Sequence, residues 1–386
     1  MNVKSDYVSL CGTTFVNLIR YKFSKFGFMF KATINTFLLF LVLLIQSCCI
    51  NDCDEPVDEF NTTPYSLEIP SSLPPIDVPL DNPLTEEGVS LGRMLFYEPL
   101  LSRDGTQSCA SCHRQATGFS DPNQFSTGID GDQGERNAMA LINIAWSDEL
   151  NWDGSSINLE VQAFEPVRNP VEMHDTWLNV SDKLNAHAEY PDLFKAAFNI
   201  DEIDSNYVVK AIAQFERTLI SGNSKWDQWY RGEVTLTEQE LRGWDLFNVD
   251  RTDFSAGADC FHCHGAPHFT DFTFHNNGLD SDENFSDLGL YETTGSDLDK
   301  AKFKTPTLRN IEVTGPYMHD GRFSTLEEVI EHYNSGGHAS STVDPLMKNI
   351  GDGLLLSPED KQALLAFLRT LTDEEFLNNP EFSNPF

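Results

Sequence analysis

Apolar residues recur at helical spacing in several parts of the chain. The clearest run starts at Asp204 and puts Val208, Ile212 and Phe215 on one face. A second run, residues 326–333, has apolar or aromatic residues at positions i, i+3, i+4 and i+7. The alternation of apolar and polar residues that is typical of strands is scarce. The pattern therefore predicts a mainly α-helical protein.

Helix start signals support this prediction. Residues 237–240 (T-E-Q-E) and 324–327 (S-T-L-E) each match a capping box, in which a hydroxyl residue is followed three positions later by Glu. Residues 357–360 (S-P-E-D) predict the start of a final helix that runs to about residue 371. A shorter helix is predicted over residues 87–95.

Three stretches rich in Gly, Pro or Asp show little periodicity and are predicted to be loops: residues 117–137, 151–173 and 265–299. No histidine occurs from residue 114 through residue 173.

Residues 1–47 at the N-terminus are predicted to be a targeting segment. Three lysines precede an apolar run at residues 37–45, which is too short to span a bilayer. The run leads into I-Q-S-C, which resembles a bacterial lipobox and predicts export, cleavage before Cys48 and a lipid on its thiol, with Met29 as a plausible start. A plain cleaved signal or an uncleaved anchor is the alternative.

Composition divides the remainder into three parts. Residues 48–83 are rich in Pro, Asp, Glu and Ser and are predicted to be a tether. The helical run from Asp204 ends at S-G-N around residue 222, where we place a domain boundary. The chain of 386 residues is therefore predicted to hold two folded domains, residues 84–222 and 223–386.

The most specific feature is a C-x-x-C-H pentad that occurs twice, at residues 109–113 and 260–264. In this spacing the two thiols can bond to the vinyl groups of a haem, and the adjacent histidine can ligate the iron. The sequence therefore predicts two covalently bound c-type haems. The predicted attachment and ligand residues are Cys109, Cys112, His113, Cys260, Cys263 and His264.

Zinc or a dithiol redox pair are the alternatives to haem for a C-x-x-C motif. Zinc would need a second Cys or His pair at finger-like distance, and none follows either pentad closely. A dithiol pair does not need the histidine. The other four cysteines all lie within the first 53 residues, so no evenly spread set remains for a disulfide framework.

Further short motifs accompany the pentads. They are W-D-G at 152–154, L-E-x-Q-A at 159–163, N-P-V-E-M at 169–173, T-P-T-L-R-N at 305–310 and P-Y-M-H-D-G at 316–321. In this order and spacing they resemble the bacterial di-haem cytochrome c peroxidase family, which includes the MauG-type enzymes. The resemblance covers most of the two predicted domains and implies two cytochrome c-like haem domains in tandem.

The resemblance implies different tasks for the two haems. The first, on His113, would bind hydrogen peroxide, and the second, on His264, would store or relay electrons. Glu172 and Gln162 fall where the family places its distal pair, in which a carboxylate moves a proton between the peroxide oxygens and an amide orients the ligand. A surface Glu and a capping Gln are the plain alternative.

The resemblance also implies residues for electron transfer between the haems and for cation binding. Trp152 matches the inter-haem tryptophan, although ordinary core packing would explain it equally. Asn137, Thr314 and Pro316 match positions that bind a calcium ion between the domains, and hard oxygen ligands suit calcium. A loop Asn and a turn Pro are common without any ion.

The sequence departs from the family pattern at the second haem. Electron-accepting members have a Met fourteen residues after the His of P-Y-x-H-D-G, and counting from His319 that position is Tyr333. A tyrosine there resembles the MauG branch, where phenolate ligates iron and favours its higher oxidation states, so a low-potential second haem is predicted. Met318 and Met347 are the other sulfur candidates, and a plain core tyrosine is the alternative for Tyr333.

The loop after the first pentad also departs from some relatives. Those relatives block the first haem with a loop histidine until the second haem is reduced. This loop contains no histidine. We therefore predict a first haem that is five-coordinate or water-bound and reacts without prior reduction.

The chain is strongly acidic, with 60 Asp and Glu against 26 Lys and Arg and a net charge of −34. Without residues 1–47 the count is 59 acidic against 21 basic residues, a net charge of −38. Such a protein repels nucleic acid and anionic lipid and would attract a basic partner such as a small cytochrome, although solubility alone would also explain the charge.

Together these features predict a lipid-anchored, periplasm-facing peroxidase that reduces hydrogen peroxide to water with electrons from a small cytochrome or another donor. A MauG-like enzyme that oxidises a protein side chain is the alternative that Tyr333 favours. A non-catalytic di-haem electron carrier would have two six-coordinate irons, and Glu172 argues against it.

Overall fold

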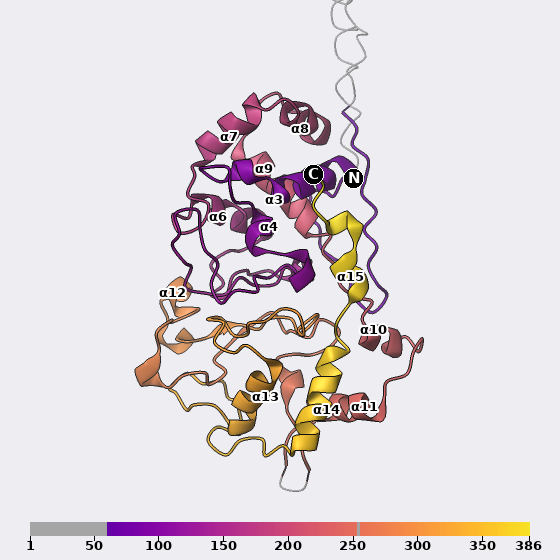
Figure 1. Ribbon diagram of the computed structural model, residues 1–386, viewed down its shortest axis with the longest axis vertical. Coiled ribbons are helices and arrows are strands. Elements are labelled where there is room, and N and C mark those ends of the chain that lie inside the picture. Colours follow the sequence, from indigo (N-terminus) through magenta and orange to yellow (C-terminus); the bar gives the residue numbers. More distant parts are fainter. Residues whose placement is uncertain (1–59, 253–254) are drawn as a thin grey trace, which may run out of the picture. The chain divides into compact units, whose positions relative to one another are not determined.

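The computed structural model describes residues 60–252 and 255–386 (Figure 1). The chain divides into two units, Met1–Asn61 and Thr62–Phe386, and the fold described below is that of the second unit. The predicted targeting segment and the predicted lipid-bearing Cys48 lie outside the described residues.

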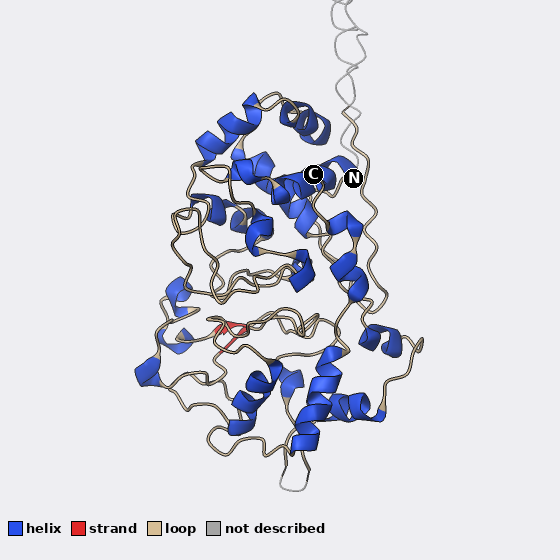
Figure 2. Ribbon diagram, viewed as in Figure 1, coloured by secondary structure: helices blue, strands red, loops and turns tan. Residues whose placement is uncertain are grey.

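Helices and long loops make up this unit, and strand is confined to one short pair (Figure 2). The prediction of a mainly α-helical protein is confirmed. β1 (Phe274–His275) and β2 (Phe303–Lys304) pair antiparallel. The α-helices are α3 (Glu86–Tyr97), α4 (Cys109–Cys112), α5 (Leu159–Gln162), α6 (Phe164–Arg168), α7 (Trp177–Ala186), α8 (Tyr190–Phe198), α9 (Ser205–Glu216), α10 (Lys225–Tyr230), α11 (Glu238–Phe247), α12 (Tyr291–Thr294), α13 (Leu326–Ser335), α14 (Pro358–Arg369) and α15 (Glu374–Asn378).

The first helical group is built on the packing of α3 against α9, with α7 and α8 beside them (Figure 1). Gly92 permits the close approach of α3 to α9, because a Cβ atom there would lie only 1.9 Å from the carbonyl oxygen of Ala211. The apolar faces of these helices form one core, which includes Leu91, Leu95, Val208 and Ile212. The helical face predicted from residue 204 onward is therefore buried as expected.

The second group is built on α11 packed against α14, with α13 against α14. Gly243 of α11 serves the same purpose as Gly92, since a Cβ atom there would lie 2.0 Å from the carbonyl oxygen of Ala363. Aromatic rings pack among leucines in this core, and Trp226, Phe247 and Phe367 are buried in it. Each helical group thus has a core of its own.

The chain returns to the first group at its C-terminal end. Phe376 of α15 and Phe382 pack against Phe119 in a core that also contains Phe96 of α3. The hydroxyl of Tyr97 donates to the carbonyl of Phe382 at 2.7 Å. Figure 1 shows α15 lying beside the first helical group, beyond the end of α14.

The described residues before α3, from residue 60 onward, form no helix, but they contact the body. The Tyr65 amide donates to the Leu84 carbonyl at 3.1 Å, and the indole of Trp146 donates to the Pro74 carbonyl at 3.1 Å. Leu73 is buried. Residues 62–83, within the predicted tether, are therefore attached to the folded unit at several points.

Three predictions of secondary structure need correction. The capping box of α13 lies one residue later than predicted, because Thr325 is the N-cap and its hydroxyl accepts from the Glu328 amide while the Glu328 carboxylate accepts from the Thr325 amide. The stretch 151–173, predicted to be loop, contains α5 and α6. The stretch 265–299, also predicted to be loop, contains β1 and α12. Five further helices carried no sequence prediction: α4, α7, α8, α10 and α15.

A buried ion pair ties the start of α10 to the motif at 305–310. Arg309 donates to both carboxylate oxygens of Asp227, at 2.8 and 2.9 Å, and both side chains are fully buried. Arg309 also donates to the carbonyl of Pro267, in the loop after the second pentad. Burial alone would raise the pKa of Asp227, but the hydrogen bonds and positive charge of Arg309, together with the hydrogen bonds from Ser224, outweigh burial and hold that pKa below its usual range.

Asp227→Ala would leave the Arg309 guanidinium buried without its carboxylate. We expect the free energy of unfolding of the holoprotein to fall by about 3–5 kcal/mol, because an uncompensated buried charge is costly. Denaturant titration followed by tryptophan fluorescence measures this.

Arg242→Ala is the matched control, since Arg242 pairs with Asp360 at 2.7 Å but its side chain is 48% exposed. That variant should lose less than about 1 kcal/mol. Equal losses in the free energy of unfolding of the two variants would contradict the larger stabilisation that we assign to the buried pair.

Candidate functional site

The first pentad forms a single helical turn. Ser108 precedes α4, and the Ser108 amide donates to the Ser111 hydroxyl at 3.0 Å. The turn places Cys109 and Cys112 three residues apart, on one side of the helix. The His113 amide closes the turn by donating to the Cys109 carbonyl at 2.9 Å. The two thiols and the imidazole therefore occupy adjacent positions.

A hydrogen bond defines the state of the His113 ring. Its Nδ1 lies 2.8 Å from the carbonyl oxygen of Phe119, a residue with a left-handed backbone (φ 59°). Because a carbonyl can only accept, Nδ1 carries the proton and Nε2 remains as the atom that can ligate a metal. Burial also lowers the pKa of His113, which favours this neutral ring.

The second pentad repeats the arrangement. Nδ1 of His264 lies 3.1 Å from the carbonyl oxygen of Phe269, which also has a left-handed backbone (φ 54°). The His264 amide donates to the Cys260 carbonyl at 2.9 Å. Burial lowers the pKa of His264 as well. Both histidines are thus held in the tautomer that an axial haem ligand needs.

The pentad cysteines are poorly suited to thiolate chemistry. None of the four cysteines in the described part of the chain forms a disulfide. Burial raises the pKa of Cys260 and Cys263 to about 12 and raises that of Cys109 and Cys112 as well. Reactive dithiols are activated by a lowered pKa, so these buried thiols argue against a dithiol redox pair.

A cavity of about 220 Å³ adjoins the second pentad. Cys260, Cys263 and His264 form part of its wall, and most of the remaining wall is apolar. Three side chains considered as the sixth iron ligand lie on the same wall: Tyr333, Met318 and Met347. The fold therefore brings the predicted attachment residues and all the predicted ligand candidates to one space.

Tyr333 reaches this cavity from α13. Its hydroxyl accepts a hydrogen bond from Nδ2 of Asn277 at 3.2 Å. Burial raises the pKa of Tyr333 to about 12, while the Asn277 hydrogen bond acts in the opposite direction. An ionised Tyr333 therefore needs a nearby positive charge, and a ferric iron would provide one.

Trp152 lies between the two groups of helices and lines the same cavity. Its indole donates to the Asn137 carbonyl at 2.8 Å, and its own carbonyl accepts from the Lys304 amide of β2 at 2.9 Å. The neighbouring Arg136 forms ion pairs with Asp153 on one side and with Asp287 on the other. These contacts fasten the W-D-G loop to the second half of the chain.

The predicted calcium ligands come from two loops that contact each other. The Asn137 amide donates to the His319 carbonyl at 2.7 Å, which joins its loop to the one that carries Thr314 and Pro316. The Asn137 side-chain nitrogen donates to the carbonyls of Asn123 and Gln124. That leaves its side-chain oxygen as the atom that could meet a cation.

Glu172 lies near the first pentad. Its carboxylate accepts from Asn169 Nδ2 at 2.6 Å, and its carbonyl accepts from the Ile129 amide at 3.0 Å. Burial raises the pKa of Glu172, and its charge in turn contributes to the raised pKa of Cys109 and Cys112. The effect on both cysteines indicates that the carboxylate lies within electrostatic range of the pentad.

Gln162, the other half of the predicted distal pair, ends α5. Asn158 caps this short helix by accepting from the Val161 amide at 2.8 Å. Among the described residues the Gln162 side-chain amide has no hydrogen-bond partner, so it is free to meet a ligand. The structure gives no contact between Gln162 and Glu172.

A second carboxyl near the first pentad carried no sequence prediction. Glu216 of α9 is 5% exposed and one of its oxygens has no partner. Burial, opposed in part by Arg217, raises the pKa of Glu216 to about 8. Arg217 instead pairs with both oxygens of Glu160, at 2.7 and 2.8 Å. The signal was present in the sequence, since Glu216 occupies an apolar-face position of the predicted helix.

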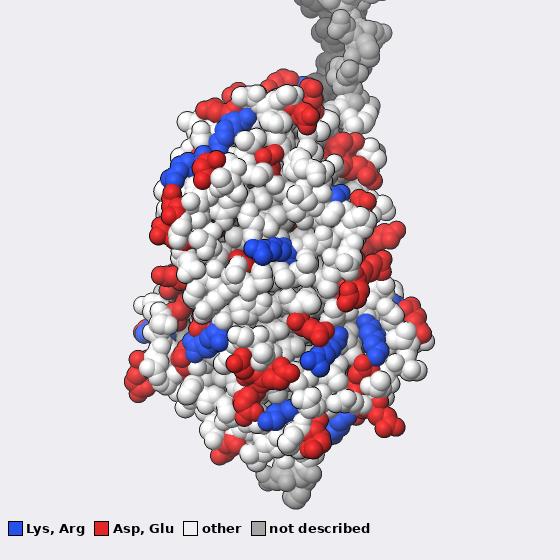
Figure 3. All heavy atoms as spheres, viewed as in Figure 1, with Lys and Arg blue, Asp and Glu red and all other residues white. Residues whose placement is uncertain are grey.

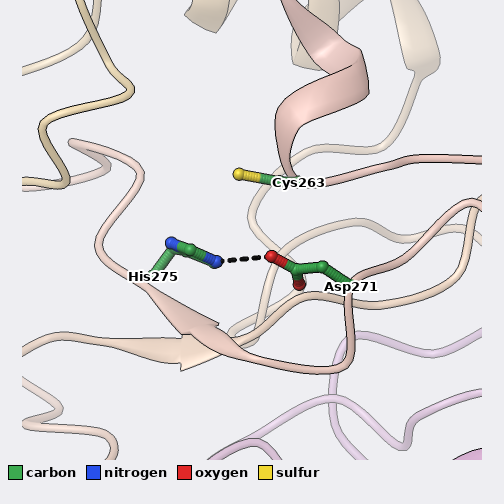
Figure 4. Close-up of side chains that lie close together, drawn as sticks. All are labelled: Cys263, Asp271 and His275. Atoms are coloured by element: carbon green, nitrogen blue, oxygen red, sulfur yellow. Dashed lines mark hydrogen bonds and ion pairs between the residues drawn. The ribbon is translucent and has the colours of Figure 1, made fainter.

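A cluster beside the second pentad was also missed. His275 of β1 lies between two carboxylates, with Nε2 2.8 Å from Asp271 and Nδ1 2.6 Å from Asp344. Figure 4 shows the His275 ring pointing toward Asp271, with the Cys263 sulfur nearby. The hydrogen bond that His275 donates to the Asp271 carboxylate is the main cause of the raised pKa of His275. The cluster could hold a metal ion only if the Cys263 sulfur carried no haem.

Comparison with known proteins decides the family. Residues 86–235 match the family model of the di-haem cytochrome c peroxidases. The methylamine utilization protein MauG of Methylorubrum extorquens is 37% identical over 298 residues, which are 77% of this chain and 81% of that protein. The chain belongs to the di-haem cytochrome c peroxidase family.

Two further proteins support this membership. Cytochrome-c peroxidase IdrP1 of Pseudomonas sp. (strain SCT) is 33% identical over 334 residues, covering 78% of this chain and 85% of that protein. A crystal structure of a MauG-like protein associated with microbial copper homeostasis has a TM-score of 0.77 and 37% identity, and the match covers 83% of this chain and 99% of that one.

The protein is thus an enzyme of the di-haem peroxidase type, and the family implies two haem c groups. The residues present fit these groups. Each pentad offers two protonated thiols and a histidine with its Nε2 available, and the second pentad opens on a largely apolar cavity. Over the described residues, no helix has both the length and the apolar character that a membrane span requires.

Proposed function

We propose that this enzyme reduces hydrogen peroxide to water with electrons from a small cytochrome or another periplasmic donor. The observation that carries the proposal is the placement of Glu172, a largely buried carboxyl with a raised pKa, close to the first of two haem-binding pentads. Each peroxide molecule takes up two electrons and two protons and yields two water molecules. Cytochrome-c peroxidases among the relatives support this reaction.

We assign the chemistry to residues as follows. A haem on His113 would supply the iron at which peroxide is activated, and a haem on His264 would supply the second electron store. Glu172 takes the proton from the inner peroxide oxygen and gives it to the outer one, and its raised pKa suits a group that both accepts and donates. Gln162 orients the ligand through its free amide. Trp152 provides the stepping stone between the two haems.

Glu172→Gln removes the group that moves the proton. We expect kcat for peroxide reduction to fall by about 10²–10⁴-fold, the usual contribution of a general acid–base, while both haems stay attached. Steady-state assays with a reduced cytochrome as donor measure this, with the haem spectra as a check on folding.

Glu165→Gln is the matched control, because Glu165 lies on α6 near Glu172 but its side chain is 56% exposed and pairs with Arg168. The control should keep its activity. A Glu172→Gln variant as active as the control would overturn the assignment.

The first haem is proposed to be open in the oxidised protein. The loop that follows the first pentad contains no histidine, and the first histidine beyond it, His174, is held at the surface by Asp130 and Arg103. This loop therefore offers no histidine to block the iron before reduction. The second iron is proposed to be ligated by His264 and Tyr333.

A MauG-like reaction is the second candidate function. In this reaction the enzyme would oxidise a protein side chain instead of a small electron donor. Tyr333 at the cavity of the second pentad favours this candidate, because phenolate ligation stabilises high oxidation states. The 37% identity to a MauG protein supports it as well.

Mixing the fully oxidised holoprotein with hydrogen peroxide distinguishes a reactive from a gated first haem. We expect rapid changes in both haem spectra without any reductant, because neither peroxide access nor the Tyr333-ligated second haem depends on prior reduction. Stopped-flow spectroscopy measures the rate. The Tyr333→Met variant is measured beside the parent protein. Its second haem should no longer show the low-spin spectrum that the parent shows.

The opposite result would be an absence of reaction until one electron is added. Some other group would then block the first iron, and the enzyme would be a gated peroxidase. An unchanged low-spin signal in Tyr333→Met would show that Tyr333 is not the ligand.

We also propose a calcium ion held by Asn137, Thr314 and Pro316. The backbone carbonyl of Asn137 accepts from the Trp152 indole, so an ion on the same residue would stiffen the contact between the two halves. Chelation with EGTA should therefore slow electron exchange between the haems, and added Ca²⁺ should restore it.

Asn137→Ala serves as the control and should show no further response to EGTA. Metal analysis that finds no calcium in the active holoprotein would refute the site.

The location and the donor are proposed from sequence and charge. We propose a lipid anchor at Cys48 and a periplasm-facing position for the protein. Both proposals rest on residues outside the described part of the chain. Figure 3 shows acidic side chains over both the upper and the lower part of the visible face, with basic ones among them. With a net charge of −34, the surface as a whole favours a basic donor.

A further inference from the structure

One loop residue, Asn277, is bonded to two consecutive residues of α13. Its carbonyl oxygen lies 3.2 Å from Nε2 of His332, and its side-chain Nδ2 lies 3.2 Å from the hydroxyl of Tyr333. His332 is buried, and Asn277 lines the cavity of the second pentad. The loop and the helix are therefore joined at the residue proposed as the iron ligand.

The loop is fixed from its other side too. The Gly278 carbonyl accepts from the His338 amide at 2.7 Å. The Asn276 side chain donates to the hydroxyls of Ser340 and Thr342, and its carbonyl accepts from the Asp344 amide at 2.9 Å. Because these bonds do not involve Tyr333, the position of the Asn277 amide is determined independently of the ligand that it contacts.

The same amide nitrogen also contacts a competing ligand. Nδ2 of Asn277 lies 3.4 Å from the sulfur of Met318, which lines the same cavity. A side-chain amide has two hydrogens, so it can donate to both groups at once. The phenol oxygen is the better acceptor of the two, and it becomes better still when ionised, because hydrogen bonds to charged groups are the stronger ones.

We propose that Asn277 is a positioning residue for the second haem, whose amide holds the Tyr333 oxygen in place as the axial ligand and withdraws electron density from it. This inference rests on the proposed ligation by Tyr333. A donor to the phenolate weakens its donation to the iron. The amide therefore sets the second haem at a higher potential than an unsupported phenolate would.

The test compares Met318→Leu with Met318→Leu/Asn277→Leu in the holoprotein. The shared Met318 change removes the sulfur that the same amide contacts, and Leu at 277 removes the donor at similar size while the backbone bond to His332 remains. We expect the ratio of oxidised to reduced second haem at a fixed potential to rise about tenfold. For one electron this is about 59 mV toward lower potential.

Asn277→Asp in the same background is the second variant, since it keeps the shape and the backbone bonds but replaces the donor with an acceptor. It should lower the potential at least as much or lose the tyrosinate signature. Spectroelectrochemistry and low-temperature electron paramagnetic resonance measure the potential and the ligand set without reference to activity.

The two possible failures are distinguishable. If Tyr333→Phe in the Met318→Leu background keeps the low-spin spectrum, the proposed ligation is wrong. If Tyr333→Phe removes that spectrum but both Asn277 variants leave the potential and spectrum unchanged, ligation stands and the role of Asn277 is refuted.

Discussion

The arrangement of both haem-binding pentads depends on one constraint, the hydrogen bond from each histidine Nδ1 to a phenylalanine carbonyl. The carbonyls of Phe119 and Phe269 can meet the rings because both residues adopt a left-handed backbone. That bond selects the tautomer, orients the imidazole and leaves Nε2 for iron. The side chains of the same two residues are buried in the two cores, so each ligand is fastened to the packing of its own half.

The contacts between the halves hold Trp152, the residue of the proposed electron path, in position. Trp152 bonds through its indole to Asn137 and through its carbonyl to Lys304, so it is held from both directions at the edge of the second cavity. Arg136 adds ion pairs to Asp153 and Asp287 beside it. α15 packs against the core around Phe119 and so adds apolar contacts between the C-terminal part of the chain and the first helical group. A stepping stone between redox centres works best where its distance to each is constant, and these contacts support the proposed role of Trp152 for that reason.

The buried ionisable side chains near the first pentad differ from those near the second. Near the first, Glu172 and Glu216 are carboxyls whose pKa is raised by burial, which favours proton transfer there. Near the second, the space is largely apolar, and Tyr333 faces it with a raised pKa and an amide donor. A carboxyl that exchanges protons suits peroxide chemistry, whereas an apolar pocket with an ionisable phenol suits storage of oxidising equivalents. The division of labour proposed for the two haems follows from this contrast.

The sequence by itself determined the features that depend on neighbouring residues. The C-x-x-C-H spacing places two thiols and a histidine on one helical turn, and α9, α11, α13 and α14 follow from apolar periodicity and caps. Where two local signals overlapped, sequence could not choose: Ser324 and Thr325 are each followed three residues later by Glu, and only the structure identifies Thr325 as the cap.

Tertiary contacts decided the remainder. Short helices such as α15 form because a core receives them, and five residues carry too little periodicity to be read in advance. Glu172, Gln162 and Tyr333 were predicted from family motifs, yet their surroundings come from residues far away in the chain. Whether Arg217 neutralises Glu216 or pairs with Glu160, and whether an amide meets Tyr333, depends on packing between distant segments. Such pairings leave no local pattern, because the chain brings the partners together only when it folds.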